Sequence, residues 1–109
     1  MDADADFAFA MVDIGQRLIA LKKPVEAEIM FVAAEKSLSG LISRTPDKEA
    51  QIKAMLLQQI GFIRGHYLNE ADQAAKDLSE AVRLQPDDIY LQRSRDALAN
   101  EHALLAVKK

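Results

Sequence analysis

Residues 60–86 read IGFIRGHYLNEADQAAKDLSEAVRLQP, and this stretch decides the fold. Five marker residues follow one another at steps of thirteen, four, three and five, and in order they are Gly61, Ala74, Leu78, Ala81 and Pro86. Good helix formers surround them, and Asn69-Glu70 between them is typical of a turn. Small residues at helical spacing let two helices approach closely, so the stretch predicts a pair of packed antiparallel helices.

The same pattern occurs once more, in residues 13–38, which read DIGQRLIALKKPVEAEIMFVAAEKSL. Gly15, Ala27, Phe31 and Ala34 follow at steps of twelve, four and three. Ser39 stands where the first stretch has its proline, so the helix is expected to run on past that point. Two such units predict a repeat architecture, in which glycine and alanine mark the places where helices cross.

The period of the apolar residues extends these two hairpins to five helices. The first, second and fourth helices are predicted over residues 6–21, 24–43 and 71–85. Thr45 or Asp47 is expected to cap the third helix, which ends near Gly65 or Tyr67, and Asp87-Asp88 to cap the fifth. The apolar positions are Phe7, Met11, Ile14, Leu18 and Leu21 in the first helix, Val25, Ile29, Val32 and Leu38 in the second, Ile52, Leu56, Ile60 and Ile63 in the third, and Leu91, Leu98 and Leu105 in the fifth.

Helix ends carry the charges that helix dipoles favour. Asp2, Asp4 and Asp6 suit the start of the first helix, and Lys22-Lys23 suits its end. Gly40 could end the second helix early, but the apolar Leu41-Ile42 pair favours its continuation to Thr45-Pro46.

Composition supports an all-α fold and restricts the partners. The chain has 109 residues, of which 50% are hydrophobic but only 6% aromatic, with four glycines and three prolines, so turns are few. A net charge of −3 and scattered basic residues exclude a phosphate-binding stripe, and hence nucleic acid. No apolar run approaches the length of a membrane span, and acids stand where a secretory signal carries basic residues, so we expect a cytoplasmic protein without a membrane partner.

The marker residues resemble those of the tetratricopeptide repeat (TPR) family, whose units show Gly, Ala, a bulky residue, Ala and a closing Pro at these intervals. The unit ending at Pro86 matches best. Ala27 and Ala74 are 47 residues apart, more than the common repeat length of 34. The nearest relatives would therefore be long-helix variants such as the kinesin light chain repeats, in which the exit of the turn resembles Glu26-Ala27-Glu28. The resemblance implies a TPR-like right-handed stack of two antiparallel hairpins, residues 5–44 and 47–85, with a capping helix over residues 88–107. A plain helical bundle is the alternative.

Members of this family bind peptides on a concave face formed by the first helix of each pair. Carried over, that face would consist of Phe9, Val12, Asp13, Gln16, Met55, Gln58, Gln59, Phe62 and His66. Val12 and Gln16 stand where some members have the Lys and Asn that clamp a carboxylate, which argues against a receptor of that type. The alternative is a closed bundle, in which Phe9, Val12, Met55 and Phe62 contact the fifth helix.

Residues for catalysis or for cofactor binding are scarce. The chain has no cysteine and two histidines. His66 and Glu70 have a spacing that could hold a metal, but Gly65 and Asn69 place them in a turn, and His102 is expected at the surface. We therefore expect no enzyme activity, no cofactor and no metal.

The sequence predicts a non-enzymatic interaction scaffold, an adaptor or chaperone that binds a helix or an extended peptide in the concave apolar groove. The alternative is a self-associating structural module, a homodimer in which a second copy fills the groove. Because the groove pairs apolar residues with glutamines, its binding should depend little on salt, and a strong salt effect would instead implicate charges such as Asp13, Arg17 or Arg64.

Overall fold

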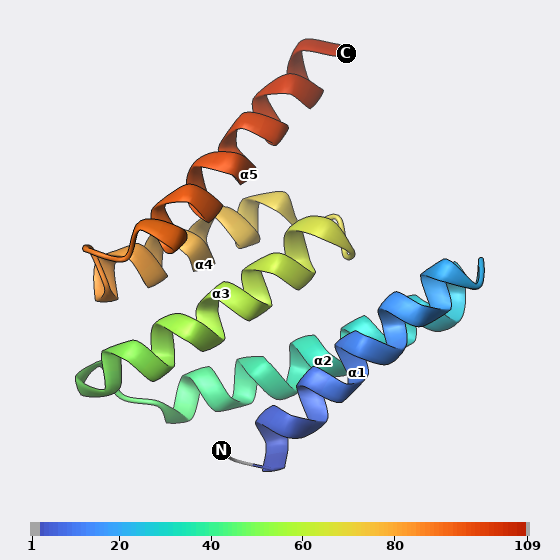
Figure 1. The fold of residues 1–109 in the computed structure, drawn as a ribbon, viewed down its shortest axis with the longest axis horizontal. Helices are drawn as coiled ribbons and strands as arrows, with labels where there is room; N and C mark the ends of the chain where they lie inside the picture. The colour runs from blue at the N-terminus through green and yellow to red at the C-terminus, as the bar shows by residue number, and fades with distance from the viewer. Residues whose placement is uncertain (1–2, 109) are drawn as a thin grey trace.

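The computed structural model describes the backbone of residues 3–108 and the side chains of residues 4–100, and the chain is almost entirely helical (Figure 1). The described part contains five α-helices, α1 (Ala3–Ala20), α2 (Pro24–Arg44), α3 (Ala50–His66), α4 (Ala71–Leu84) and α5 (Ile89–Lys108), with a 3₁₀ turn at Asp47–Glu49 before α3. It contains no strand. The all-α prediction is confirmed, and α2 runs through Gly40 as expected.

The helices pack mainly on their neighbours in sequence. The closest pairs are α1 with α2 and α3 with α4, while α2 also meets α3 and α4 meets α5. In Figure 1, α1 and α3 lie in front of their partners α2 and α4, and α5 lies beside α4. The molecule measures 41 × 40 × 18 Å, so its thickness is that of two helix layers.

Both hairpins reverse the chain at a residue with a positive φ angle. Lys22 and Asn69 have positive φ angles of 63° and 57° and are 47 residues apart, the same offset as Ala27 and Ala74. After α1, the backbone N–H of Lys23 donates to the Leu18 carbonyl at 2.8 Å, which closes a Schellman-type turn. The repeat seen in the sequence therefore includes the turns.

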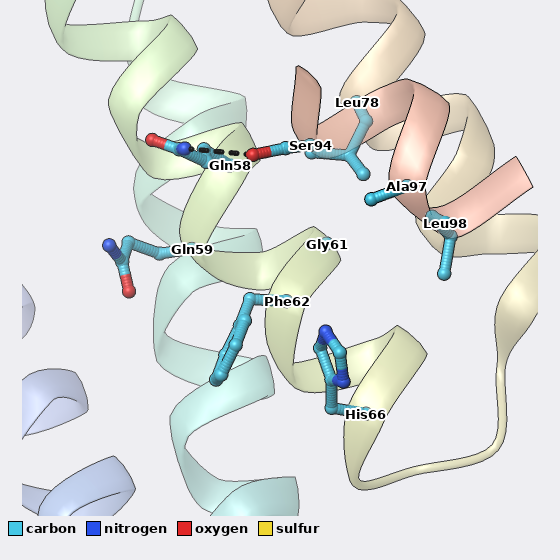
Figure 2. A pocket seen from close by; sticks show the side chains of 9 residues that line it. All are labelled: Gln58, Gln59, Gly61, Phe62, His66, Leu78, Ser94, Ala97 and Leu98. Atoms are coloured by element: carbon cyan, nitrogen blue, oxygen red, sulfur yellow. Dashed lines mark hydrogen bonds between the residues drawn. The ribbon is translucent and has the colours of Figure 1, made fainter. Parts of the chain in front are cut away.

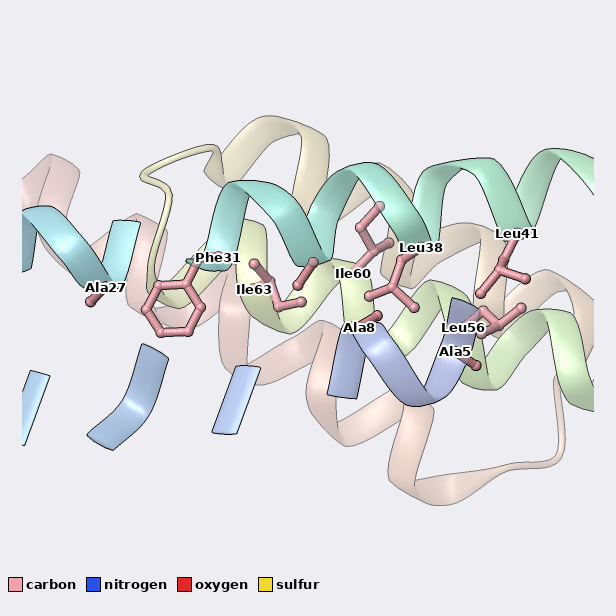
Figure 3. Close-up of a cluster of buried hydrophobic side chains, with 10 residues drawn as sticks. Ala5, Ala8, Ala27, Phe31, Leu38, Leu41, Leu56, Ile60 and Ile63 are labelled. Carbon is pink, nitrogen blue, oxygen red and sulfur yellow. The ribbon is translucent and has the colours of Figure 1, made fainter. Parts of the chain in front are cut away.

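The main core lies where α1, α2 and α3 meet (Figure 3). Its buried residues are Ala5, Ala8, Ala27, Phe31, Ala34, Leu38, Leu41, Leu56, Ile60 and Ile63. Each repeat glycine lies against the bulky residue of its own unit: a Cβ on Gly15 would fall 2.7 Å from Phe31 Cε1, and one on Gly61 would fall 3.2 Å from Leu78 Cγ. All four repeat alanines are buried, including Ala74 and Ala81 in hairpin two.

The apolar positions of α1 and α2 are less buried than their spacing suggests. Helix α1 buries Ala5 and Ala8, whereas its larger residues Phe7 and Ile14 are 47% and 40% exposed. Small side chains face α2 because they allow the two backbones to approach closely. Other exposed apolar residues are Ile19 of α1, Leu21 just after it, Val25, Ile29 and Val32 of α2, and Ile52 and Phe62 of α3.

One predicted helix cap is confirmed and another is wrong. The Asp88 carboxylate accepts the backbone N–H of Tyr90 at 2.9 Å, as an N-cap of α5 should. Thr45 does not cap α3; its hydroxyl donates to the Leu41 carbonyl at 2.7 Å and thereby closes α2. Asp47 begins the intervening 3₁₀ turn and pairs with Lys53 instead, so it does not cap α3 either.

A partly buried ion cluster joins the two hairpins. Arg64 of α3 donates from Nε to Glu35 Oε2 of α2 and from Nη1 to Asp77 Oδ2 of α4, both at 2.8 Å. Glu70 lies 3.6 Å away, and Gln73 donates to the second Asp77 oxygen. Arg64 thus contacts carboxylates from both neighbouring helices and is not a free surface charge.

Burial and ion pairing act in opposite directions on the pKa values of Arg64 and Asp77. Burial alone would lower the pKa of Arg64, but the hydrogen bonds with Glu35 and Asp77 raise it above its usual range, so the guanidinium stays charged. Burial raises the pKa of the Asp77 carboxyl above its ordinary value of 3.8, and Arg64 offsets this only in part. Arg64 and Asp77 both stay charged because each provides the other with an oppositely charged hydrogen-bond partner.

Replacing Ala81 by leucine should lower the free energy of unfolding by about 1–3 kcal/mol, because Ala81 is fully buried beside Ala54, Leu57 and Leu91. Urea denaturation followed by circular dichroism measures the change. Ala75→Leu is the matched control, since Ala75 lies on the exposed side of the same helix. Equal stability of the two variants would contradict close packing at Ala81.

Candidate functional site

A cavity of about 500 Å³ lies between α3 and α5 (Figure 2). Nine residues line it: Gln58, Gln59, Gly61, Phe62 and His66 of α3, Leu78 of α4, and Ser94, Ala97 and Leu98 of α5. In Figure 2 the Gln58 side chain reaches Ser94 of α5, whereas Gln59 and Phe62 point away from α5. Volumes of this size are typical of sites that hold a small molecule or a few side chains.

Buried apolar residues and a glycine form part of the cavity wall. Leu78 and Leu98 are 4% and 8% exposed, and they belong to the small core cluster that also contains Ala74. Gly61 has no side chain, and Ala97 on α5 is small, so both leave space between the two helices. The cavity therefore results from small residues at facing positions of α3 and α5.

Uncharged polar groups border the cavity. The Gln58 amide donates to the Ser94 hydroxyl at 3.4 Å, a long hydrogen bond that links α3 to α5. Gln59 lies one residue further along α3 and is half-buried. Amide and hydroxyl groups can donate to and accept from a peptide backbone, so the border can bind an extended or helical segment without charge.

Aromatic contacts connect the border of the cavity to the main core. The Phe62 ring lies 4.5 Å from His66 and meets Tyr67 edge-on at 5.6 Å, both measured between ring centroids. Tyr67 in turn stacks on the buried Phe31 at 4.0 Å. Phe62 is 40% exposed, so its position is held by neighbours while part of its surface remains open.

The structure brings together four of the nine residues predicted to bind a peptide. Gln58, Gln59, Phe62 and His66 line the cavity. Of the others, Phe9, Val12 and Met55 are partly buried and pack against the main core.

The two remaining predicted residues lie on α1 outside the cavity. Asp13 forms an exposed ion pair with Arg17 at 3.2 Å. The Gln16 amide donates to the Tyr67 hydroxyl at 3.2 Å and so links α1 to the end of α3. The α1 part of the predicted groove is therefore separate from the cavity.

Sequence reasoning missed the α5 side of the site. Ser94, Ala97 and Leu98 line the cavity, and none of them was among the residues expected to bind a peptide. The signal in the sequence is weak: Ser94 and Ala97 are small residues three positions apart, and therefore on one helix face. The sequence does not show which face of α5 meets α4, so the spacing of Ser94 and Ala97 does not identify a site.

Electrostatically, the cavity is close to neutral. Of its nine lining residues, His66 alone has a titratable side chain. Within the described part of the chain, no group of three or more His, Cys, Asp or Glu residues could hold a metal ion. In the same part, no helix combines the length and apolarity that crossing a membrane requires.

Comparisons of this chain with protein-family models, with curated proteins and with solved structures gave no match.

Proposed function

We propose that this chain is a non-enzymatic protein-interaction module of the TPR type, an adaptor or chaperone that holds a partner segment in the cavity between α3 and α5. The observation that carries the proposal is the cavity itself, with Leu78 and Leu98 in its wall and no Asp, Glu, Lys or Arg lining it. Such a site fits an apolar side chain from a helix or an extended peptide.

The repeat-like organisation supports this proposal. In a TPR-type stack, α3 and α5 are the first helices of successive units, and these helices face the concave side. The equivalent first helix of the first unit is α1, which contributes Gln16 beside Tyr67. A partner could therefore extend from the cavity along α3 toward α1, with the exposed surface of Phe62 between them.

The proposed binding mode has an apolar anchor and uncharged borders. One apolar side chain would enter beside Leu78, Ala97 and Leu98, and the amides of Gln58 and Gln59 would bind the partner backbone. Burial of apolar area supplies most of the affinity in such an arrangement, about 25 cal/mol for each Å² removed from water.

Substitution of Phe62 by glutamate should weaken binding at least tenfold, about 1.4 kcal/mol, because it places a charge at an apolar anchor site. The probe is a peptide selected from a phage-displayed random library on the wild-type chain, with Kd measured by fluorescence anisotropy. Ile52→Glu is the matched control, since Ile52 is a 52% exposed residue of α3 outside the cavity. Ala97→Phe should also weaken binding, by filling the space without adding charge.

The same titration at low and at high ionic strength tests a second prediction. Affinity should change less than tenfold between low and high ionic strength, because screening acts on charges and the cavity presents almost none. Selected peptides that bind Phe62→Glu and Ala97→Phe as tightly as the wild type would place the binding site elsewhere and overturn the proposal.

A further inference from the structure

One apolar face of α1 is open, and we refer to it as the outer face. It consists of Phe7, Met11, Ile14, Leu18 and Leu21. These residues follow at steps of four, three, four and three, the spacing of a coiled-coil seam. Phe7, Ile14 and Leu21 are 47%, 40% and 66% exposed, while Met11 and Leu18 are partly buried against the main core.

The second repeat shows what such a face does when it is covered. Gly15 and Gly61 are equivalent, so the outer face of α1 corresponds on α3 to Lys53, Leu57, Ile60, Arg64 and Tyr67. Three of these residues meet α2 of the preceding hairpin. Ile60 is fully buried in the cluster that holds Phe31 and Leu38 of α2, Arg64 binds Glu35, and Tyr67 stacks on Phe31.

In α3, this face is therefore a surface on which a helix packs. In α1 the equivalent positions are all apolar, whereas α3 includes two charged residues, Lys53 and Arg64, each with a carboxylate partner. The described helices leave a little under half of Phe7 and two fifths of Ile14 exposed to solvent. A contiguous apolar seam of this kind is the usual mark of an interaction surface on a protein.

The charges at the two ends of α1 indicate both the occupant and its orientation. Asp6 lies in the first turn beside Asp4, which pairs with Arg44. Lys22 and Lys23 lie just beyond the other end, after Arg17, which pairs with Asp13. A second α1 in antiparallel orientation would bring its basic end to the acidic end of the first, twice by symmetry. A parallel pair would instead juxtapose like charges and like ends of the helix dipoles.

We propose that the outer face of α1 is a self-association surface, on which a second copy of this chain docks with its own α1 antiparallel. The contact is isologous, the commonest arrangement in homodimers. It lies on a different surface from the cavity between α3 and α5, and it is independent of the function proposed above.

The size of the contact predicts a weak dimer. Helix α1 has 18 residues and is therefore about 27 Å long. A single pair of such helices lies at the low end of specific interfaces, below about 1,200 Å². The dimer should accordingly dissociate on dilution, so concentration has to be varied in its test.

Sedimentation velocity of the full chain from about 1 µM to about 1 mM covers the range expected for such a dimer. The wild type should shift from monomer to dimer as concentration rises. Ile14→Lys should remain monomeric throughout, because it places a charge at the centre of the seam, and Ile14→Ser serves if the lysine variant fails to fold. Circular dichroism verifies the fold of each variant.

Two further variants test whether the dimer forms through a different surface. Ile29→Lys makes the same change on an exposed face of α2, and Phe62→Glu alters the cavity; both should dimerise like the wild type. A wild type that stays monomeric at 1 mM, or a dimer that survives Ile14→Lys and is lost in Ile29→Lys or Phe62→Glu, would overturn the proposal.

Introduced cysteines test the orientation, since the chain has none of its own. A Phe7→Cys chain mixed with a Leu21→Cys chain and oxidised should give mainly the mixed disulfide, because antiparallel helices place these ends together. Disulfides formed only between identical chains would show a parallel pair and would contradict the antiparallel arrangement.

Discussion

Replacing Arg64 by alanine is expected to lower the free energy of unfolding by about 3 kcal/mol, because it leaves the carboxylate of Asp77 buried without its cation. Glu35 loses the same partner, so α2, α3 and α4 are all affected. Urea denaturation gives the change directly. Arg44→Ala is the matched control: it also breaks an ion pair between helices, with Asp4, but both of those side chains are 59% exposed, and such pairs contribute little.

The loss of unfolding free energy in Arg64→Ala should also depend on pH, and the raised pKa of Asp77 gives its direction. A carboxyl whose pKa is raised in the folded state binds more protons folded than unfolded, so its contribution to stability falls as pH rises from 3.8 through the folded pKa. Removal of Arg64 takes away the interaction that lowers the Asp77 pKa. The folded-state pKa then rises further, so the pH range over which stability falls extends to higher pH. The difference between wild type and Arg64→Ala should be largest near neutral pH and should shrink toward pH 4. A difference independent of pH would show that lost packing, and not the unpaired carboxylate, dominates.

Replacing Phe31 by alanine is expected to lower the free energy of unfolding by about 3–5 kcal/mol, since the ring is 1% exposed at the centre of the main core. It fills the space over Gly15 and stacks on Tyr67, with ring centroids 4.0 Å apart. Its loss leaves a cavity and also removes an aromatic pair, which adds about 0.5–1.5 kcal/mol beyond area burial.

Thermal and urea denaturation of Phe31→Ala measure the change, and Val32→Ala is the control on the adjacent, 45% exposed position. The control should stay within about 0.5 kcal/mol of the wild type. Tyr67 is one of only two tyrosines, so the near-ultraviolet circular dichroism should change as well. A Phe31→Ala variant as stable as the control would mean that this core is not packed as described.

Local patterns in the sequence predicted the helices well and their surroundings less well. The buried alanines and the Asp88 cap were predictable, because close packing and capping each require particular residue types at fixed spacing. The burial of α1 residues was not predictable: the larger apolar residues have a clear helical period, yet Ala5 and Ala8 are the α1 residues buried in the main core. Periodicity identifies an apolar face but does not say what covers it.

The ion cluster and the cavity depend on contacts that the sequence does not display. Arg64 meets Glu35, 29 residues earlier, and Asp77, 13 residues later, and no local spacing marks that set. Four of the α3 residues named from the sequence line the cavity, but none of the α1 residues does, and α5 forms the other wall. The orientation of α5 depends on the packing of Leu91 and Leu98, which single-sequence patterns leave open.

The packing of each helix on its neighbour in sequence has a consequence for how the chain folds. Contacts between consecutive helices require only short loops to close, and this keeps the entropic barrier low. Proteins dominated by such local contacts fold within microseconds to milliseconds. Each hairpin can form before the other, so the search is nearly one-dimensional. The docking of α3 on α2, with Ile60 and Ile63 in the same buried cluster as Phe31 and with Arg64 bound to Glu35, is then the step that couples the two hairpins into one cooperative unit.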